Sequence, residues 1–205
     1  RFFPDSRVNF AENLLRKTGP EAAIIFRSEN GERVEWSWDR LHATVSRIQQ
    51  ALIDQGVGVG DRVAGFVPNR PETVAAMLAT ASLGAVWSSC SPDFGFNGVI
   101  DRFGQIEPKV MFCADAYHYN GKVFSSIGTA GKLAEAMPSV TQIVVIPYVE
   151  ERADIAPLGA KGIHLEDLLQ KHDEKGVAYA RVPFGSPLYI MFSSGTTGLP
   201  KCIVH

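Results

Sequence analysis

The chain has 205 residues, 45% of them hydrophobic and 20% charged, and a formal net charge of −2 at pH 7. This composition is typical of a globular protein with one large domain or two small ones. The near-neutral charge argues against a nucleic-acid partner or an anionic membrane surface, and no apolar run is long enough to span a bilayer.

The first 60 residues or so predict a β-hairpin followed by a helix. Ala22–Ser28 and Arg33–Trp38 have strand character around a Glu-Asn-Gly turn. The helix that follows has Ser37 as its N-cap, and Gly56 ends it. Its predicted buried face consists of Leu41, Val45, Ile48 and Leu52.

Residues 61–147 alternate between strand and helix patterns. This alternation predicts an α/β fold, in which βαβ units form a parallel sheet with flanking helices on both faces. The expected strands are Arg62–Val67, Ala85–Ser89, Lys109–Cys113 and Gln142–Ile146. The expected helices are one entered at Pro71 with the face Val74, Met77, Leu78 and Ala81, one carrying Val99, Phe103 and Ile106, and one at Lys132–Met137.

Residues 148–186 break this rhythm with Gly, Pro and charged residues. They predict a surface connection with one short helix at Leu165–Gln170. Residues 187–205 then predict a strand, a Gly-rich loop and a second strand, with the first strand at Leu188–Phe192.

The loop has the composition of a polyphosphate cradle. Glycines let backbone N–H groups converge on an anion, hydroxyls add donors, and a lysine adds a mobile positive charge. It is not a Walker A loop, because two residues separate its glycines and no helix follows its lysine. The candidate phosphate-binding residues are Ser193, Ser194, Gly195, Thr196, Thr197, Gly198 and Lys201.

At these residues the chain resembles the adenylate-forming superfamily of acyl-CoA synthetases, luciferases and peptide-synthetase adenylation domains. Tyr189–Lys201 matches the phosphate-loop signature of that superfamily without a gap. Other segments are similar to its acetate- and acetoacetate-activating branch, and most of them to the acetoacetate-activating members: Arg1–Leu15, Trp87–Gly95, Asn97–Lys109, Tyr119–Lys122 and Val145–Tyr148.

The resemblance implies ATP-dependent activation of acetoacetate in the cytoplasm, through an acyl-adenylate, to the CoA thioester. ATP, Mg²⁺ and coenzyme A are the implied cofactors and co-substrates, and Lys201 neutralises charge on the leaving pyrophosphate. Residues 1–205 would be part of the large N-terminal, AMP-binding domain. The superfamily's adenine, ribose and metal motifs and its C-terminal domain are absent, so we expect this piece alone to be inactive. An acetyl- or propionyl-CoA synthetase, or an inactive phosphate-binding module, are the alternatives.

The same resemblance gives Asn120, Gly121 and Lys122 as a candidate CoA site, with Lys122 at a helix entry where it could bind a phosphate. Acetyl-CoA synthetases carry an Arg-rich motif at this point. The lysine here lacks the bidentate fork of arginine, and a solvated lysine is the alternative.

Two further groups of residues have simpler interpretations. Cys90, Cys113 and Cys202 lie too far apart for a metal or disulfide pattern, so we expect free thiols in a reducing cytosol, each in the core or lining it. Trp87–Ser91 lies at the end of a predicted strand, where open α/β sheets bind ligands, but packing or a turn is the favoured interpretation.

Overall fold

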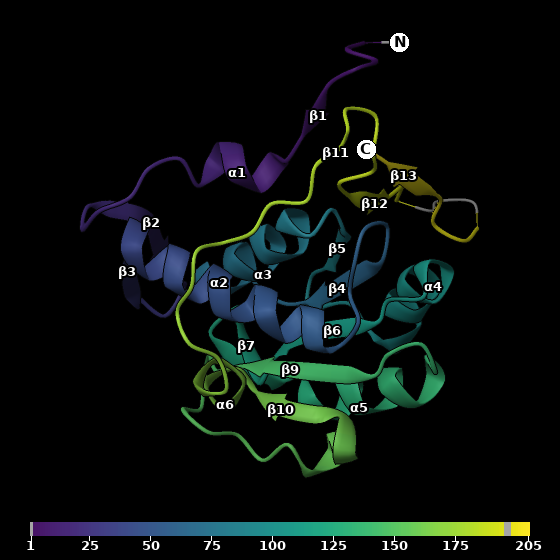
Figure 1. Cartoon of the computed structure of the whole chain (residues 1–205). Helices are drawn as coiled ribbons and strands as arrows, with labels where there is room; N and C mark the ends of the chain where they lie inside the picture. Colours follow the sequence, from purple (N-terminus) through teal and green to yellow (C-terminus); the bar gives the residue numbers. More distant parts are fainter. Residues whose placement is uncertain (1, 195–197) are drawn as a thin grey trace.

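The computed structural model describes residues 2–194 and 198–205. A five-stranded sheet lies at the core of the fold (Figure 1). Its strand order is β10-β9-β6-β4-β5, and every neighbouring pair is parallel. The sheet confirms the predicted α/β class. The strands are β4 (Arg62–Phe66), β5 (Val86–Cys90), β6 (Val110–Ala114), β9 (Gln142–Ile146) and β10 (Gly162–His164).

Helices cover both faces of this sheet and bury two apolar clusters against it. One cluster joins alternate strand residues such as Val63 and Phe112 to α2 and α3. The other joins the opposite residues, such as Phe66 and Met111, to α4 and α5. Strand residues alternate between the two clusters because successive side chains point to opposite faces. The helices are α2 (Trp38–Asp54), α3 (Pro71–Ser82), α4 (Phe96–Ile106) and α5 (Ile127–Ala136).

The connections explain where a ligand site can form. The chain passes from β4 through α3 to β5 at one edge, then through α4 back across β4 to β6. Because α3 and α4 pack on opposite faces, the winding reverses beside β4. Open parallel sheets bind ligands beyond the carboxyl ends of the strands near such a reversal. A ligand site is therefore expected at the carboxyl ends of β4 and β5.

The N-terminal elements follow the sequence prediction. Strands β2 (Ala22–Arg27) and β3 (Arg33–Ser37) form an antiparallel hairpin. Ser37 then caps α2 by accepting a hydrogen bond from the Arg40 N–H at 3.1 Å. A short helix, α1 (Phe10–Leu14), precedes the hairpin and packs near α3. The first strand, β1 (Arg7–Val8), pairs with β11 (Val182–Pro183).

The expectation for residues 148–186 was partly wrong. The short helix α6 (Leu165–Gln170) is confirmed, but a 3₁₀ helix, η1 (Ala156–Lys161), and β10 precede it. Because β10 pairs with β9, this segment supplies the fifth strand of the sheet and is more than a surface connection. The remainder runs as a strap past α2 and α3 to β11 (Figure 1).

Buried amides fasten that strap to the core. The Asn9 side chain donates to Ala81, Ser82 and Ala180 carbonyls at 2.9–3.1 Å. The Gln49 side chain accepts from the Ala178 N–H at 3.0 Å and donates to its carbonyl at 2.6 Å. Both amides are at most 5% exposed, so their hydrogen bonds form away from water and join residues 178–180 to α2 and to the N-terminal segment.

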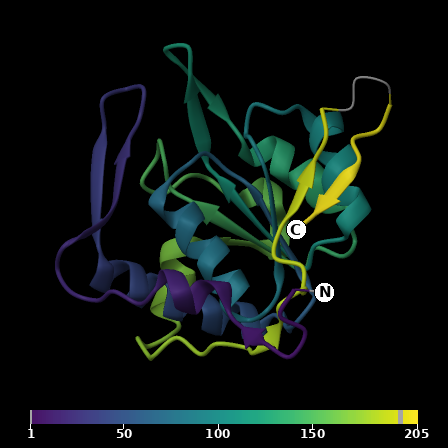
Figure 2. The ribbon, with the colours of Figure 1, turned by 90° about the horizontal axis from the view of Figure 1, so that it is seen from above.

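A second hairpin was not predicted. Strands β7 (Ala116–Tyr119) and β8 (Lys122–Ser125) pair antiparallel and project from the body beside the tip of the β2–β3 hairpin (Figure 2). The Gly121 N–H donates to the Glu29 carboxylate at 3.2 Å, which joins the two tips. The helix expected at Lys132–Met137 begins five residues earlier, at Ile127.

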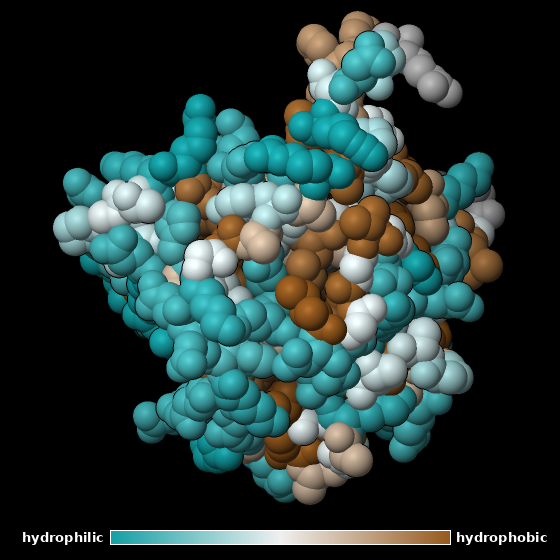
Figure 3. All heavy atoms as spheres, viewed as in Figure 1, coloured by the Kyte–Doolittle hydropathy of each residue, from teal (hydrophilic) through white to brown (hydrophobic). Residues whose placement is uncertain are grey.

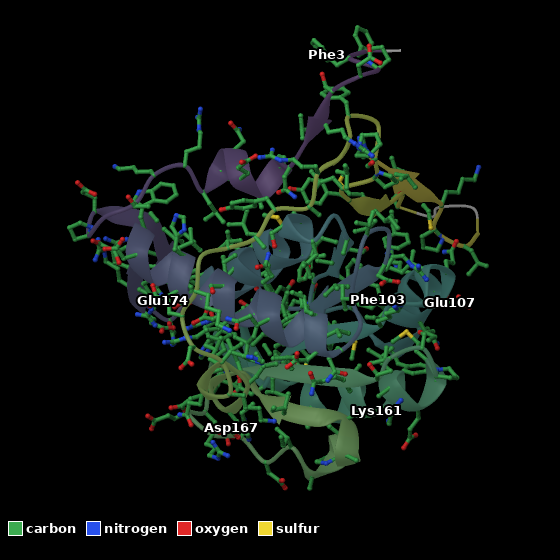
Figure 4. The ribbon with its side chains drawn as sticks, viewed as in Figure 1. Phe3, Phe103, Glu107, Lys161, Asp167 and Glu174 are labelled. Carbon is green, nitrogen blue, oxygen red and sulfur yellow. The ribbon has the colours of Figure 1, made fainter. Side chains whose placement is uncertain are left out.

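The surface is mixed in character. Figure 3 shows hydrophilic residues over most of one face, with apolar residues gathered near its centre. Figure 4 shows Phe103 within the body, where it is fully buried, whereas Phe3 projects from the N-terminal segment. None of the described helices has both the length and the apolar character needed to cross a membrane.

Candidate functional site

The predicted strand–loop–strand unit is confirmed in the described residues. Strands β12 (Ile190–Phe192) and β13 (Cys202–Val204) pair antiparallel and carry the loop between them. The base of the loop is closed twice. The Ser193 N–H donates to the Lys201 carbonyl and the Lys201 N–H donates to the Ser193 hydroxyl, both at 3.0 Å.

Three of the seven predicted phosphate-binding residues, Gly195, Thr196 and Thr197, lie outside the described residues. Of the remainder, Gly198 has φ of 149°, a conformation that residues with a Cβ rarely adopt. Lys201 is exposed, and its backbone helps to close the loop. The structure therefore places Ser193, Ser194, Gly198 and Lys201 at one loop, and their ligand-binding roles stay predictions.

The loop is attached to the open edge of the sheet. The Trp87 N–H donates to the Leu188 carbonyl at 3.0 Å, and the Ser88 hydroxyl donates to the Ile190 carbonyl at 2.7 Å. A parallel bridge joins Trp87 to Tyr189. These bonds place β12 beside β5, so the loop leaves the sheet in the direction in which the parallel strands end.

A cavity of about 730 Å³ lies between β5, α3, α4 and the start of the loop. Its size is within the range of small-molecule sites. All five residues of Trp87–Ser91 line this cavity. Trp87, Ser88 and Cys90 are also buried, which agrees with the favoured packing interpretation, and a ligand-binding role of the segment stays a prediction. The other lining residues are Asn69, Thr73, Val74, Met77, Phe94, Arg102, Tyr189, Ile190, Met191, Phe192, Ser193 and Ser194.

The two titratable groups other than arginine on the cavity wall are protonated at neutral pH. Burial raises the pKa of the Cys90 thiol to about 12, which outweighs the lowering by nearby Arg102. Burial also raises the pKa of the Tyr189 hydroxyl, which lies 3.6 Å from the Met77 sulfur. A thiol with so high a pKa is a poor nucleophile, so Cys90 is not a candidate for covalent chemistry at this cavity.

The expectation for the three cysteines holds for two of them. Cys90 lines the cavity and Cys113 is fully buried in the sheet, whereas Cys202 on β13 is exposed, which corrects the prediction that it lies in the core or lines it. Its strand is short and at the edge of the protein, so an apolar neighbourhood in the sequence did not produce burial.

Helix α4 supports both sides of the loop, which sequence reasoning missed. The Gln105 side chain donates to the Pro200 carbonyl at 2.9 Å, directly before Lys201. One turn earlier, the Arg102 guanidinium lies 5.9 Å from the ring centre of Phe192, the last residue of β12. Gly98, Arg102 and Gln105 lie on one face of the helix, at i, i+4 and i+7. The two polar side chains on this face were the sequence feature that could have indicated a contact with the loop.

The proposed CoA residues have a different setting from the expected one. Asn120 and Gly121 have φ of 50° and 71° and form the two-residue turn of the β7–β8 hairpin. Lys122 therefore begins a strand, and the expected helix entry is wrong. The Gly121 N–H is engaged by Glu29, so this turn does not present it to a phosphate. A role of Lys122 in CoA binding stays a prediction, but a helix N-terminus no longer supports it.

The fold and site define an α/β protein in which a doubly wound parallel sheet carries a strand–loop–strand unit beside an edge cavity. In the described residues no helix follows the loop, which distinguishes this class from the Walker A proteins. The chain matches the AMP-binding enzyme family over residues 11–205 and belongs to that family.

Several characterised proteins are similar to the whole of this chain. The acetoacetyl-coenzyme A synthetase of Rhizobium meliloti is 54% identical over 205 residues, and the acetoacetyl-CoA synthetase of Macaca fascicularis is 42% identical over 211. The solved acetoacetyl-CoA synthetase from Streptomyces lividans superposes with a TM-score of 0.90 at 40% identity. In each case the match covers 100% of this chain and 31% of the relative.

Proposed function

We propose that the full-length protein is an acid–thiol ligase that converts acetoacetate, ATP and CoA to acetoacetyl-CoA. Support comes from relatives of that printed name, which are similar across the whole chain and not only at the loop. The observation that carries the proposal is the closed base of the Ser193–Lys201 loop at the mouth of a cavity large enough for substrates. The free thiols of the described cysteines favour the cytoplasm as its compartment.

In the proposed first step, the acetoacetate carboxylate attacks the α-phosphorus of ATP and pyrophosphate leaves. In the second, the CoA thiol attacks the acyl carbonyl carbon, and AMP leaves as the thioester forms. Preorganised donors aimed at the leaving phosphates favour the first step, because they are fixed before the charge redistributes. We assign this role to the backbone N–H groups of residues 194–198, the hydroxyls of Thr196 and Thr197, and the Lys201 ammonium.

The proposal includes Mg²⁺ as a cofactor. Among the described residues, no three His, Cys, Asp or Glu side chains gather in a way that could hold a metal ion. Mg²⁺ commonly arrives bound to substrate phosphates and keeps few protein ligands. We therefore propose it as the counter-ion of ATP and assign it no ligand or step here.

Replacing Lys201 with alanine tests the function. In the full-length protein we expect pyrophosphate release with acetoacetate to fall by about 100-fold, as for the loss of one transition-state donor. Thioester formation from supplied acetoacetyl-adenylate should change little. Lys132→Ala, an exposed lysine on α5, is the matched control and should leave both steps unchanged.

The substrate is tested in parallel with acetate and propionate. A higher kcat/KM for either of these than for acetoacetate would contradict the substrate assignment while leaving the ligase class intact. Absence of pyrophosphate release and thioester with every acid would contradict the ligase itself. Equal slowing of both steps by Lys201→Ala would remove the role assigned to that lysine.

A further inference from the structure

Arg102 is the one charged side chain among the described residues that line the large cavity. It projects from the middle of α4, and the proposed reaction assigns it no role. The other polar groups on the wall are hydroxyls, one amide and one thiol, all neutral at pH 7 or held so by burial. A single guanidinium in such a wall is a local source of positive potential.

Aromatic rings hold this guanidinium in place. Its central carbon lies 4.7 Å from the ring centre of Phe94 and 5.9 Å from that of Phe192. One nitrogen donates to the Gly98 carbonyl at 2.6 Å. Contacts of this kind restrict the side chain without neutralising it. The side chain is therefore positioned before any ligand arrives.

Most of its hydrogen-bonding capacity is unused by the part of the chain that the structure describes. Arg carries five N–H donors, and Gly98 is the one acceptor recorded for Arg102. None of the ion pairs between described residues includes it. A charged group with free donors on a cavity wall has the chemistry to receive an anion.

The position of Arg102 indicates which anion. Phe192, against which it lies, is followed directly by Ser193 at the base of the phosphate loop. Gln105, three residues further along α4, holds the other side of that base through Pro200. The guanidinium thus faces the cavity next to the loop, and a planar fork matches two oxygens of a phosphate.

We propose that Arg102 binds a phosphate group of a nucleotide co-substrate and is a second positive site beside Lys201. The proposal rests on the proposed function, since it requires a phosphate-bearing ligand in this cavity. The polyphosphate of ATP and the diphosphate of CoA share the required chemistry, and the binding experiment separates these two sources.

The test is calorimetric titration of the full-length protein and its Arg102→Met variant with ATP, with CoA and with adenosine. Methionine keeps an unbranched side chain for packing on the two rings but has no charge. Loss of a charged hydrogen-bonded contact should weaken binding of one phosphate ligand by about 10- to 100-fold and leave adenosine binding unchanged.

Arg40→Met is the matched control. Arg40 also stacks on an aromatic ring, at 4.6 Å from the ring centre of Trp36, but it does not line the cavity. Its replacement should leave all three affinities unchanged. If Arg102→Met lowers the melting temperature, Arg102→Gln provides the same comparison, because its amide can still donate to the Gly98 carbonyl.

Weaker binding of ATP alone assigns the site to its polyphosphate, and weaker binding of CoA alone assigns it to the CoA diphosphate. Unchanged affinity for both overturns the role of Arg102. In that case, retained pyrophosphate release by the variant would show that the proposed function stands without it. A parent protein that binds neither nucleotide would overturn both proposals.

Discussion

Gly65, the fourth residue of β4, has no room for a side chain. A Cβ atom built there would lie 2.7 and 2.9 Å from the Trp87 ring atoms Cζ2 and Cη2, and 3.0 Å from a methyl group of Val67. Trp87 is 5% exposed and packs near Phe112, so its ring has no free space into which to move away from the cavity. Gly65→Ala therefore forces the indole toward the cavity or separates β4 from the edge strand β5.

The cost follows from these distances. Overpacking a well-packed core by a methyl group costs about 1–3 kcal/mol. Alanine returns about 0.5–1 kcal/mol of backbone entropy in a strand. The difference lies between about 0 and 2.5 kcal/mol, and the close contact with a buried ring favours its upper half, so we expect a net loss of about 1–2.5 kcal/mol in the free energy of unfolding. Gly104→Ala in α4 is the matched control, because its new Cβ meets only the Ile100 side chain at 3.8 Å. That change should stabilise the protein by about 0.5–1 kcal/mol.

Urea denaturation followed by circular dichroism measures both changes. Adding Trp87→Phe to Gly65→Ala should recover part of the loss, because the smaller ring leaves room for the methyl group. A coupling energy of about 1 kcal/mol is expected for residues in such contact. Unfolding free energies of Gly65→Ala and Gly104→Ala that change in the same direction, or additive effects of Gly65→Ala and Trp87→Phe, would refute the reasoning.

Two further predictions concern the cysteines and Gln105. At pH 8 an aromatic disulfide reagent should modify the exposed Cys202 in the native 205-residue chain well before Cys90 and Cys113. Burial raises the pKa of each of the other two thiols to about 12 and keeps them protonated. Rapid reaction of more than one thiol would contradict this. In the full-length protein, Gln105→Leu should raise KM for ATP by about 2- to 12-fold through loss of its hydrogen bond to Pro200, with thioester formation from supplied adenylate unchanged. Gln170→Leu on α6 is the control, and an unchanged KM would show that α4 does not position the loop.

The elements that the sequence predicted well are those with a strong local pattern. The apolar spacing of α2 and its Ser37 cap are both present in the structure, and Pro71 occupies the first turn of α3. The strand–loop–strand unit was predictable because β-favouring residues flank a Gly-rich loop that has no helix after it. In each case residues near one another in sequence supply the determining interactions.

The failures have different physical causes. Strand β10 has three residues, too few to show a period, and it forms because it pairs with β9. The β7–β8 hairpin was predictable, since Asn-Gly is the preferred two-residue turn. The family resemblance instead favoured a phosphate site at a helix entry. The cavity depends on β12 lying beside β5, a contact between residues about 100 positions apart, which no local pattern encodes.

Helix α4 supports the base of a loop that no helix follows in the described part of the chain. A Walker A loop receives support from the first turn of the helix that follows it, whereas Ser193–Lys201 is followed by a strand. Here α4, which connects β5 to β6, contacts one side of the loop base through Gln105 and the other through Arg102. Helix α4 therefore has two roles, because it connects two strands of the sheet and also supports the base of the loop. Changes at these two positions should alter nucleotide binding more than they alter the stability of the sheet.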